Sequence, residues 1–255
     1  MGERESYEHG TFSWTDLATP DAQASKGFYG ALFGWDFEDN PIPDDGVYVM
    51  ARIDGRAAAA MFETTDRHPA WASYVTVDDL DGTTARARDL GANVLAEPFD
   101  VMDVGRMSTI QDPTGAVLCL WEPRTSIGAE IVNGPGALSV TQLNTSDPEA
   151  AERFYSELFG WRFESVGDEQ MPYWGIYRGD AMNAGMMPLP EGAPSPAHWL
   201  VYFGSEDVDA SAETIRSQGG TLMVEPMDVP PAGRILVAQD PQGAIFALFA
   251  GRFDD

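Results

Sequence analysis

Aromatic rings, methionines and one carboxylate occupy alternate positions along parts of this chain, and these residues are its candidates for chemistry. Phe12, Trp14 and Asp16 recur at every second position, a spacing that places their side chains on one face of a β-strand. Aromatic faces stack on flat organic molecules and attract cations, while a carboxylate holds an amine or a hydroxyl. The pattern therefore predicts recognition of a flat, partly cationic organic molecule, and it makes Asp16 a weak candidate for a general base.

The same alternation predicts a ligand-binding face in each half of the chain. In the first half it selects Trp14, Asp16, Ala72, Tyr74, Cys119 and Trp121, and we expect Tyr48, Met50 and Met61 to lie near them. In the second half it selects Gln142, Asn144, Trp174, Met186 and Tyr202, together with His198 and Phe249. His198 is the second weak catalytic candidate, because histidine exchanges a proton near neutral pH. For any one of these residues, packing in the core is the alternative interpretation.

The elements that position these residues occur twice. Residues 21–35 are repeated at 147–161, a spacing of 126, and residues 111–116 are repeated at 239–244, a spacing of 128. In each copy an aspartate begins a helix that ends at a glycine, and Tyr29 and Tyr155 within these helices are expected to pack against a sheet. The repeat predicts two modules at 9–124 and 136–250, joined by a surface crossing at 125–135, with two β-α-β-β-β units in each module.

Charge and composition exclude several classes of function. The chain has 41 acidic and 15 basic residues, a net charge of −26, and Lys26 is its single lysine. Nucleic-acid binding is therefore not expected, and the acidity serves either solubility or the attraction of cationic ligands. No apolar run reaches the roughly 18 residues that span a membrane, and residues 1–6 lack a signal-peptide pattern, so we expect a cytoplasmic protein. Cys119 is the single cysteine and has no partner for a disulfide.

Several of these motifs resemble the vicinal oxygen chelate superfamily of glyoxalases, bleomycin-resistance proteins and extradiol dioxygenases. They are the repeated Phe-Tyr-x-x-Leu-Phe-Gly-Trp helix end, the Val77-Asp78-Asp79-Leu80 junction and the repeated Asp-Pro-x-Gly turn. The chain looks most similar to a two-module actinobacterial branch with culture-filtrate-antigen-like proteins and accessory proteins of anthracycline biosynthesis. Over about residues 9–250 the resemblance implies an α+β fold: tandem glyoxalase-like modules, whose four βαβββ units form curved mixed sheets with helices outside.

The resemblance also implies four strand positions per module where metalloenzymes of the superfamily carry His or Glu ligands. Those positions fall at Trp14, within 57–60, at Ala72 and at Cys119 in the first module, and at Val140, within 183–185, at Leu200 and at Ala247 in the second. The three histidines, His9, His68 and His198, have no metal-binding spacing. We therefore predict no metal site and no cofactor.

These observations support two main hypotheses of function. The first is metal-independent binding of a small aromatic natural product, such as an anthracycline-like antibiotic, for resistance, sequestration or assistance to a biosynthetic oxygenase. The second is an enzyme of the glyoxalase, lyase, isomerase or hydroxylase kind that uses Asp16 or His198. An interaction protein with vestigial pockets is a third reading. The chain is expected to be a monomer or a homodimer without membrane or nucleic-acid partners.

Overall fold

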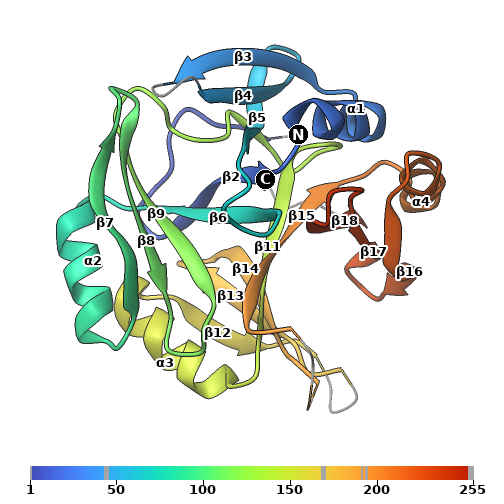
Figure 1. Ribbon diagram of the computed structural model, residues 1–255. Coiled ribbons are helices and arrows are strands. Elements are labelled where there is room, and N and C mark those ends of the chain that lie inside the picture. Colours follow the sequence, from blue (N-terminus) through green and yellow to red (C-terminus); the bar gives the residue numbers. More distant parts are fainter. Residues whose placement is uncertain (1, 43–45, 168–170, 191, 193–194, 252–255) are drawn as a thin grey trace.

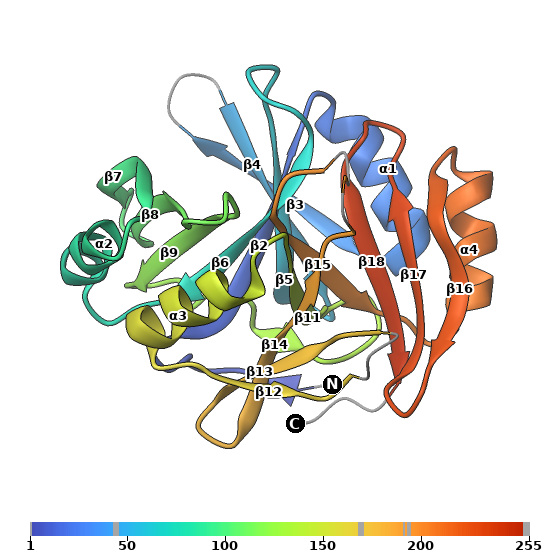
Figure 2. The same ribbon diagram turned by 90° about the horizontal axis from the view of Figure 1, so that it is seen from below.

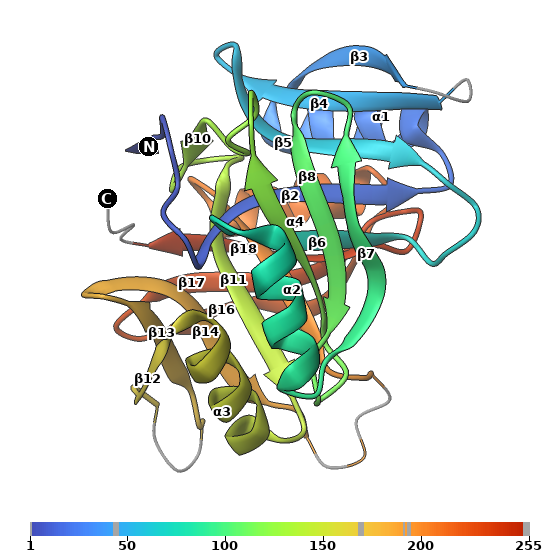
Figure 3. The same ribbon diagram turned by 90° about the vertical axis from the view of Figure 1, so that its left-hand side faces the viewer.

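The computed structural model describes residues 2–42, 46–167, 171–190, 192 and 195–251, which form two large mixed sheets and four helices. The first sheet has the order β3-β4-β5-β2-β6-β9-β8-β7, and the second repeats it as β12-β13-β14-β11-β15-β18-β17-β16. In both sheets the central pairs alternate between parallel and antiparallel. The predicted α+β architecture of tandem glyoxalase-like modules is therefore confirmed, and Figure 3 shows how the first sheet curls between β7 and β3.

The bounds of the elements follow the repeat in the sequence. The first sheet contains β2 (Thr11–Thr19), β3 (Asp36–Ile42), β4 (Gly46–Ile53), β5 (Arg56–Glu63), β6 (Ala70–Thr76), β7 (Asn93–Val101), β8 (Gly105–Gln111) and β9 (Val117–Pro123). The second contains β11 (Leu138–Thr145), β12 (Arg162–Ser165), β13 (Trp174–Arg178), β14 (Ala181–Pro188), β15 (His198–Gly204), β16 (Thr221–Val229), β17 (Gly233–Gln239) and β18 (Ile245–Gly251), with β1 (Gly2–Glu3) and β10 (Ile131–Val132) attached. The helices are α1 (Ala22–Phe33), α2 (Leu80–Asp89), α3 (Pro148–Phe159) and α4 (Val208–Ser217).

The first helix of each module begins and ends where the sequence predicts. The side chain of Asp21 accepts a hydrogen bond from the amide of Ala24, and Asp147 accepts one from Ala150. Gly34 and Gly160 end the helices at φ values of 68° and 71°, which glycine adopts without steric cost.

The two sheets pack back to back through β6 and β15, and the helices flank this seam in two pairs. α1 contacts α4 on one side and α2 contacts α3 on the other (Figures 1 and 2). Each pair therefore combines a helix from the first module with one from the second. The faces of the sheets that point away from the seam carry most of the candidate site residues.

The helix tyrosines are buried as expected, and each donates its hydroxyl proton to an aspartate of the other module. Tyr29 in α1 donates to Asp240 at 3.0 Å, and Trp71 donates to the Tyr29 hydroxyl at 2.9 Å. The second helix repeats this with Tyr155, which donates to Asp112 at 2.8 Å and accepts from Trp199 at 3.0 Å. Each Asp-Pro-x-Gly turn is thus tied to the first helix of the opposite module.

Tyr155→Phe should lower the free energy of unfolding by about 1–3 kcal/mol, because it leaves buried polar atoms of Asp112 and Trp199 without a partner. Tyr29→Phe should have a similar effect, since its contacts are equivalent. Urea denaturation measures both, and Tyr177→Phe on the partly exposed surface of β13 is the matched control. Wild-type stability in both variants would contradict a role for these contacts in joining the modules.

The connection between the modules differs from the expected surface crossing. Ala129 and Ile131 are buried, the hydroxyl of Tyr7 donates to the carbonyl of Ala129 at 2.6 Å, and β10 pairs with β1 and β11. The apolar residues between the turn-forming ones draw this segment into the core, because their burial stabilises the folded chain. The segment is therefore part of the packed structure. Among the described residues, no helix combines the length and the apolar character that crossing a membrane requires.

Candidate functional site

The side of the first sheet that points away from the seam gathers most of the residues predicted for the first module. Strand register places Trp14 opposite Tyr74 and Tyr74 opposite Cys119, while Asp16 lies opposite Ala60 and Ala72. Trp14, Asp16, Tyr48, Met50, Tyr74 and Trp121 share this side, which we call the Asp16 face. The structure thus brings the predicted carboxylate together with four of the predicted aromatic rings.

Asp16 is held by a polar network inside this aromatic surrounding. Its side chain is 4% exposed. One carboxylate oxygen, Oδ2, accepts hydrogen bonds from the hydroxyls of Tyr74 at 2.8 Å and Tyr48 at 3.0 Å. The indole of Trp14 donates to the Tyr48 hydroxyl at 3.0 Å, which fixes the tyrosine. The other oxygen, Oδ1, is buried and has no hydrogen-bond partner within the described residues.

This environment shifts the protonation of Asp16 toward neutral pH. Burial raises the pKa of Asp16 to about 6, against the opposing effects of the Tyr74 and Tyr48 hydrogen bonds and the charge of Arg67. Burial also raises the pKa values of Tyr48 and Tyr74 well above 10, so both remain hydrogen-bond donors. The Asp16 carboxyl can therefore release or take up a proton near physiological pH, and in its ionised form it can hold a cation.

Burial raises the pKa of the neighbouring Cys119 thiol to about 12. A thiol with this pKa remains protonated at neutral pH and is a poor nucleophile.

Asp16→Asn should stabilise the protein increasingly as the pH rises. The folded-state pKa of about 6 exceeds the ordinary value of 3.8 for an aspartate, so the wild type keeps its full stability below about pH 4 and loses part of it as the pH rises through 6. The variant lacks this cost, and its advantage over the wild type should grow by on the order of 3 kcal/mol between pH 4 and 7.5. Urea denaturation across this range measures the difference, and a pH-independent difference would contradict the raised pKa.

The second sheet carries an uncharged counterpart, which we call the Gln142 face. It holds Gln142 at the position equivalent to Asp16, because Gln142 lies opposite Gly185 and Leu200 as Asp16 lies opposite Ala60 and Ala72. Tyr202 donates to Gln142 at 3.2 Å, Gln142 to Asn144 at 2.9 Å, and Asn144 lies 3.3 Å from His198. The structure thus brings Gln142, Asn144, Tyr202 and the catalytic candidate His198 together.

Four residues predicted on or near the binding faces lie on the opposite, seam side of the sheets. Met61 lies opposite Leu17 and Val49, and both Met186 and Trp174 share the side of Leu143. Phe12 is separated from Trp14 by a β-bulge and packs against Trp199. Because side chains alternate with a period of two, a shift of one residue moves each to the other face. These four residues therefore belong to the core, which corrects their assignment to the binding faces.

Sequence reasoning missed Tyr173, which takes the place expected for Trp174. The pairing of Val49 with Met61 and of Trp174 with Met186 makes Tyr173 the counterpart of Tyr48. A Cβ atom at Gly185 would lie 1.8 Å from the Tyr173 hydroxyl, so this tyrosine lies directly over the strand beside Gln142. The repeat spacing was the available signal, since 48 to 173 is a spacing of 125.

The donor atoms of both faces do not fit the metal site that the resemblance implies. The central strands place Trp14, Tyr74 and Cys119 in register in the first sheet and Val140, Tyr202 and Ala247 in the second. A His/Glu site needs several imidazole and carboxylate donors directed at one point. Within the described ranges, no group of three or more His, Cys, Asp or Glu side chains lies close enough to hold an ion.

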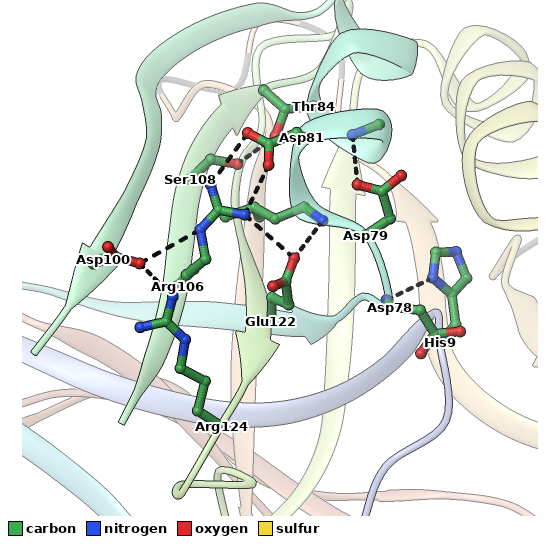
Figure 4. Close-up of polar contacts among 12 residues, drawn as sticks. His9, Asp78, Asp79, Asp81, Thr84, Asp100, Arg106, Ser108, Glu122 and Arg124 are labelled. Atoms are coloured by element: carbon green, nitrogen blue, oxygen red, sulfur yellow. Dashed lines mark hydrogen bonds and ion pairs between the residues drawn. The ribbon is translucent and has the colours of Figure 1, made fainter. Parts of the chain in front are cut away.

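The repeated arginines form ion pairs on the helix side of each sheet. Arg106 donates to Asp81 at 2.7 and 3.2 Å, and it lies within 3.5 Å of Asp100 and 3.6 Å of Glu122 (Figure 4). Arg234 repeats this with Asp209 at 2.7 and 2.9 Å. The pairs attach α2 and α4 to the sheets, so these arginines have a structural role.

The sequence of this chain is similar to those of known proteins. The sequence profile of the Glyoxalase/Bleomycin resistance protein/Dioxygenase superfamily matches residues 11–120 and 137–248. The "Putative glyoxylase CFP32" of Mycobacterium tuberculosis is 40% identical over 257 residues and covers 97% of each chain. The "Anthracycline biosynthesis protein DnrV" of Streptomyces peucetius is 34% identical over 257 residues, which cover 94% of this chain and 92% of that protein.

Solved structures with the same fold include a glyoxalase and a dioxygenase. The Mn(II)-bound glyoxalase from Novosphingobium aromaticivorans has a TM-score of 0.68 at 14% identity and covers 95% of this chain and 82% of its own. The 2,3-dioxygenase LapB from Pseudomonas sp. KL28 has a TM-score of 0.67 at 15% identity and covers 98% and 96%. At these identities the likeness shows a common fold.

Proposed function

This chain belongs to the Glyoxalase/Bleomycin resistance protein/Dioxygenase superfamily, and we propose that within it the chain binds a small aromatic, positively charged molecule without a metal ion. The observation that carries this proposal is the free oxygen of Asp16. A buried carboxylate oxygen without a hydrogen-bond partner is unfavourable, and an ammonium or hydroxyl group on a ligand would satisfy it. The Asp16 face surrounds that oxygen with aromatic rings, which suit a flat ligand.

Side chains at the surface of the Asp16 face would have to move to admit this ligand. Asp16 is 4% exposed, whereas Tyr48 and Met50 beside it are partly exposed. Methionine changes its shape at little cost, and rotation of Tyr48 would uncover Asp16 while Tyr74 keeps its hydrogen bond to Oδ2. The net charge of −26 favours the approach of a cation to this face.

We further propose that the chain assists the biosynthesis or the sequestration of an anthracycline-like natural product, acting beside a biosynthetic oxygenase. Two relatives, DauV and DnrV, are described as anthracycline biosynthesis proteins, at 33% and 34% identity. An anthracycline combines a flat aromatic ring system with a basic amino sugar. On the Asp16 face, the aromatic rings suit the ring system and the carboxylate of Asp16 suits the amine.

The probes that test this proposal are an anthracycline with its amino sugar and the corresponding neutral aglycone. We expect the charged probe to bind at least about tenfold more tightly, because a charge-assisted hydrogen bond to Asp16 contributes about 1.5–3 kcal/mol. Fluorescence titration in 0.15 M salt, with and without a chelator, measures both affinities. Equal affinities, or affinity that is lost with the chelator, would overturn the proposal.

The pKa of Asp16 also supports a second candidate function, namely acid–base catalysis on a small organic substrate. A general base works best with a pKa near the operating pH, and the value of about 6 meets that condition. Turnover of a bound ligand with a rate that rises through pH 6 and disappears in Asp16→Asn would favour the enzyme. Stoichiometric binding without turnover would favour the binding protein.

A further inference from the structure

A single hydrogen-bonded chain crosses the Gln142 face. It runs from the hydroxyl of Tyr202 to Oε1 of Gln142, from Nε2 of Gln142 to Oδ1 of Asn144, and from Nδ2 of Asn144 to Nε2 of His198. At its end Nδ1 of His198 lies 2.9 Å from the backbone carbonyl oxygen of Pro196 and 3.3 Å from the hydroxyl oxygen of Ser195, which can also accept. Four side chains from β11 and β15 are therefore linked to one backbone atom.

That backbone atom fixes the direction of every hydrogen bond in the chain. A carbonyl oxygen can only accept, so Nδ1 of His198 donates to it, and the amide nitrogen of Asn144 can only donate, so Nε2 of His198 accepts from it. Asn144 therefore accepts from Nε2 of Gln142 with its Oδ1. Gln142 in turn accepts from the Tyr202 hydroxyl with its Oε1. The proton of the Tyr202 hydroxyl is therefore committed to Gln142, and the remaining lone pair of its oxygen can accept a hydrogen bond.

The ring of Tyr202 belongs to an apolar cluster that is separate from the core at the seam. Leu200, Tyr202, Ala247 and Phe249 are its buried members, and Val140, Ile235, Val237 and Ile245 are partly buried around them. Burial raises the pKa of Tyr202, and the neighbouring, partly exposed Tyr173 raises it further, so the Tyr202 hydroxyl keeps its proton. An aromatic ring can pack against such a cluster, and a hydrogen-bond donor on that ring can reach the tyrosine.

We propose that the Gln142 face is a second binding site, specific for an uncharged aromatic molecule whose phenolic hydroxyl donates to the oxygen of Tyr202. The two faces share a pair of tyrosines, Tyr48 and Tyr74 in one module and Tyr173 and Tyr202 in the other, but a carboxyl group in the first is replaced by an amide in the second. An uncharged amide attracts a cation much less than a carboxylate does, so the second face does not select charged ligands. It selects a ligand that donates a hydrogen bond, because the oxygen of Tyr202 is left as an acceptor. This site goes beyond the proposed function and does not depend on it.

The matched probes for this site are 2-naphthol, which can donate a hydrogen bond, and 2-methoxynaphthalene, which cannot. We expect 2-naphthol to bind the wild-type protein about tenfold more tightly, the contribution of one hydrogen bond to a buried acceptor. Tyr202→Phe should remove this preference and leave the affinity for 2-methoxynaphthalene unchanged. Tyr74→Phe, at the equivalent position of the Asp16 face, should retain the preference.

Fluorescence titration of the three proteins distinguishes the outcomes, with circular dichroism confirming that each variant is folded. Equal affinity for both probes, no saturable binding of 2-naphthol, or an undiminished preference in Tyr202→Phe would overturn the site. A preference lost in Tyr74→Phe instead would mean that the hydroxyl binds at the Asp16 face, which also overturns it. Because both probes are uncharged, these outcomes are independent of the affinity for a cationic anthracycline.

His198 acts in this site as a positioning residue, because it reaches Tyr202 only through Asn144 and Gln142. His198→Leu removes the acceptor that orients both amides, so the preference for 2-naphthol should fall to about threefold or less while 2-methoxynaphthalene binds as before. His198→Gln supplies a carbonyl that can accept from Asn144 and should restore the preference. An unchanged tenfold preference in His198→Leu would overturn the role given to His198.

Discussion

Trp161→Ala should lower the free energy of unfolding by about 4 kcal/mol, the range for a buried tryptophan replaced by alanine. Trp161 is 2% exposed, and its ring stacks on Tyr155 with centroids 5.2 Å apart. Its indole donates to the carbonyl of Gly10 at 2.8 Å, and its ring lies 5.5 Å from that of Phe12. Because Gly10 and Phe12 belong to the first module, the substitution removes contacts that join the modules.

Trp14→Ala is the matched comparison, because Trp14 lies on the Asp16 face and donates to Tyr48. We expect Trp14→Ala to weaken binding of the cationic anthracycline more than Trp161→Ala does, while Trp161→Ala is the more destabilised variant. Urea denaturation gives the stabilities, and fluorescence titration under conditions where both variants are folded gives the affinities. Equal losses of affinity would contradict the placement of the ligand on the Asp16 face.

Asp16→Asn should weaken binding of the cationic anthracycline about 100-fold, because it removes a buried charge from a hydrogen-bonded pair. The side chain keeps its shape, and its oxygen can still accept from Tyr48 and Tyr74. The neutral aglycone should therefore lose less than about threefold in affinity. The same variant should be more stable than the wild type at pH 7.5, which separates loss of binding from loss of folding.

Gln142→Leu is the control for this variant, since Gln142 occupies the equivalent position in the second sheet. It should leave the affinity for the cationic probe unchanged. An affinity that falls equally in Asp16→Asn and Gln142→Leu, or that falls in neither, would show that the positive charge of the ligand is not bound at Asp16.

Local sequence rules were sufficient for the helices and for the centre of the Asp16 face. The aspartate caps and the terminal glycines are local signals, and Trp14, Asp16 and Tyr74 lie on the long central strands β2 and β6. On such strands the alternation of side chains holds over several residues. The repeat of the sequence then fixed the order of elements in the second module.

The same rules failed where strand register depends on turns and bulges. Met61, Met186 and Trp174 lie on hairpin strands, and bulges interrupt the pairing beside Ala51 and beside Ile176. One inserted residue exchanges the two faces of a strand, and the inserted residue leaves no distinct pattern in the sequence. The matched spacing of Tyr48 and Tyr173 would have been a better guide than alternation.

Contacts between the modules were beyond local reasoning for a different reason. The sequence shows that Tyr29 and Tyr155 are helix residues with a buried face, but it does not show which sheet covers them. Their partners, Asp240 and Asp112, are 211 and 43 residues away, and only the packing of complete modules brings them together. The free oxygen of Asp16 likewise depends on which tyrosines reach its carboxylate.

The pKa of Asp16, followed by ¹³C NMR of its carboxyl carbon, tests most directly whether this carboxylate holds the charged ligand. The structure predicts a value of about 6 in the free protein. Saturation with the cationic anthracycline should lower the pKa, because a bound cation favours the ionised carboxylate, whereas the neutral aglycone should not lower it. A pKa that the cationic probe leaves unchanged or raises would contradict binding of the positive charge at Asp16.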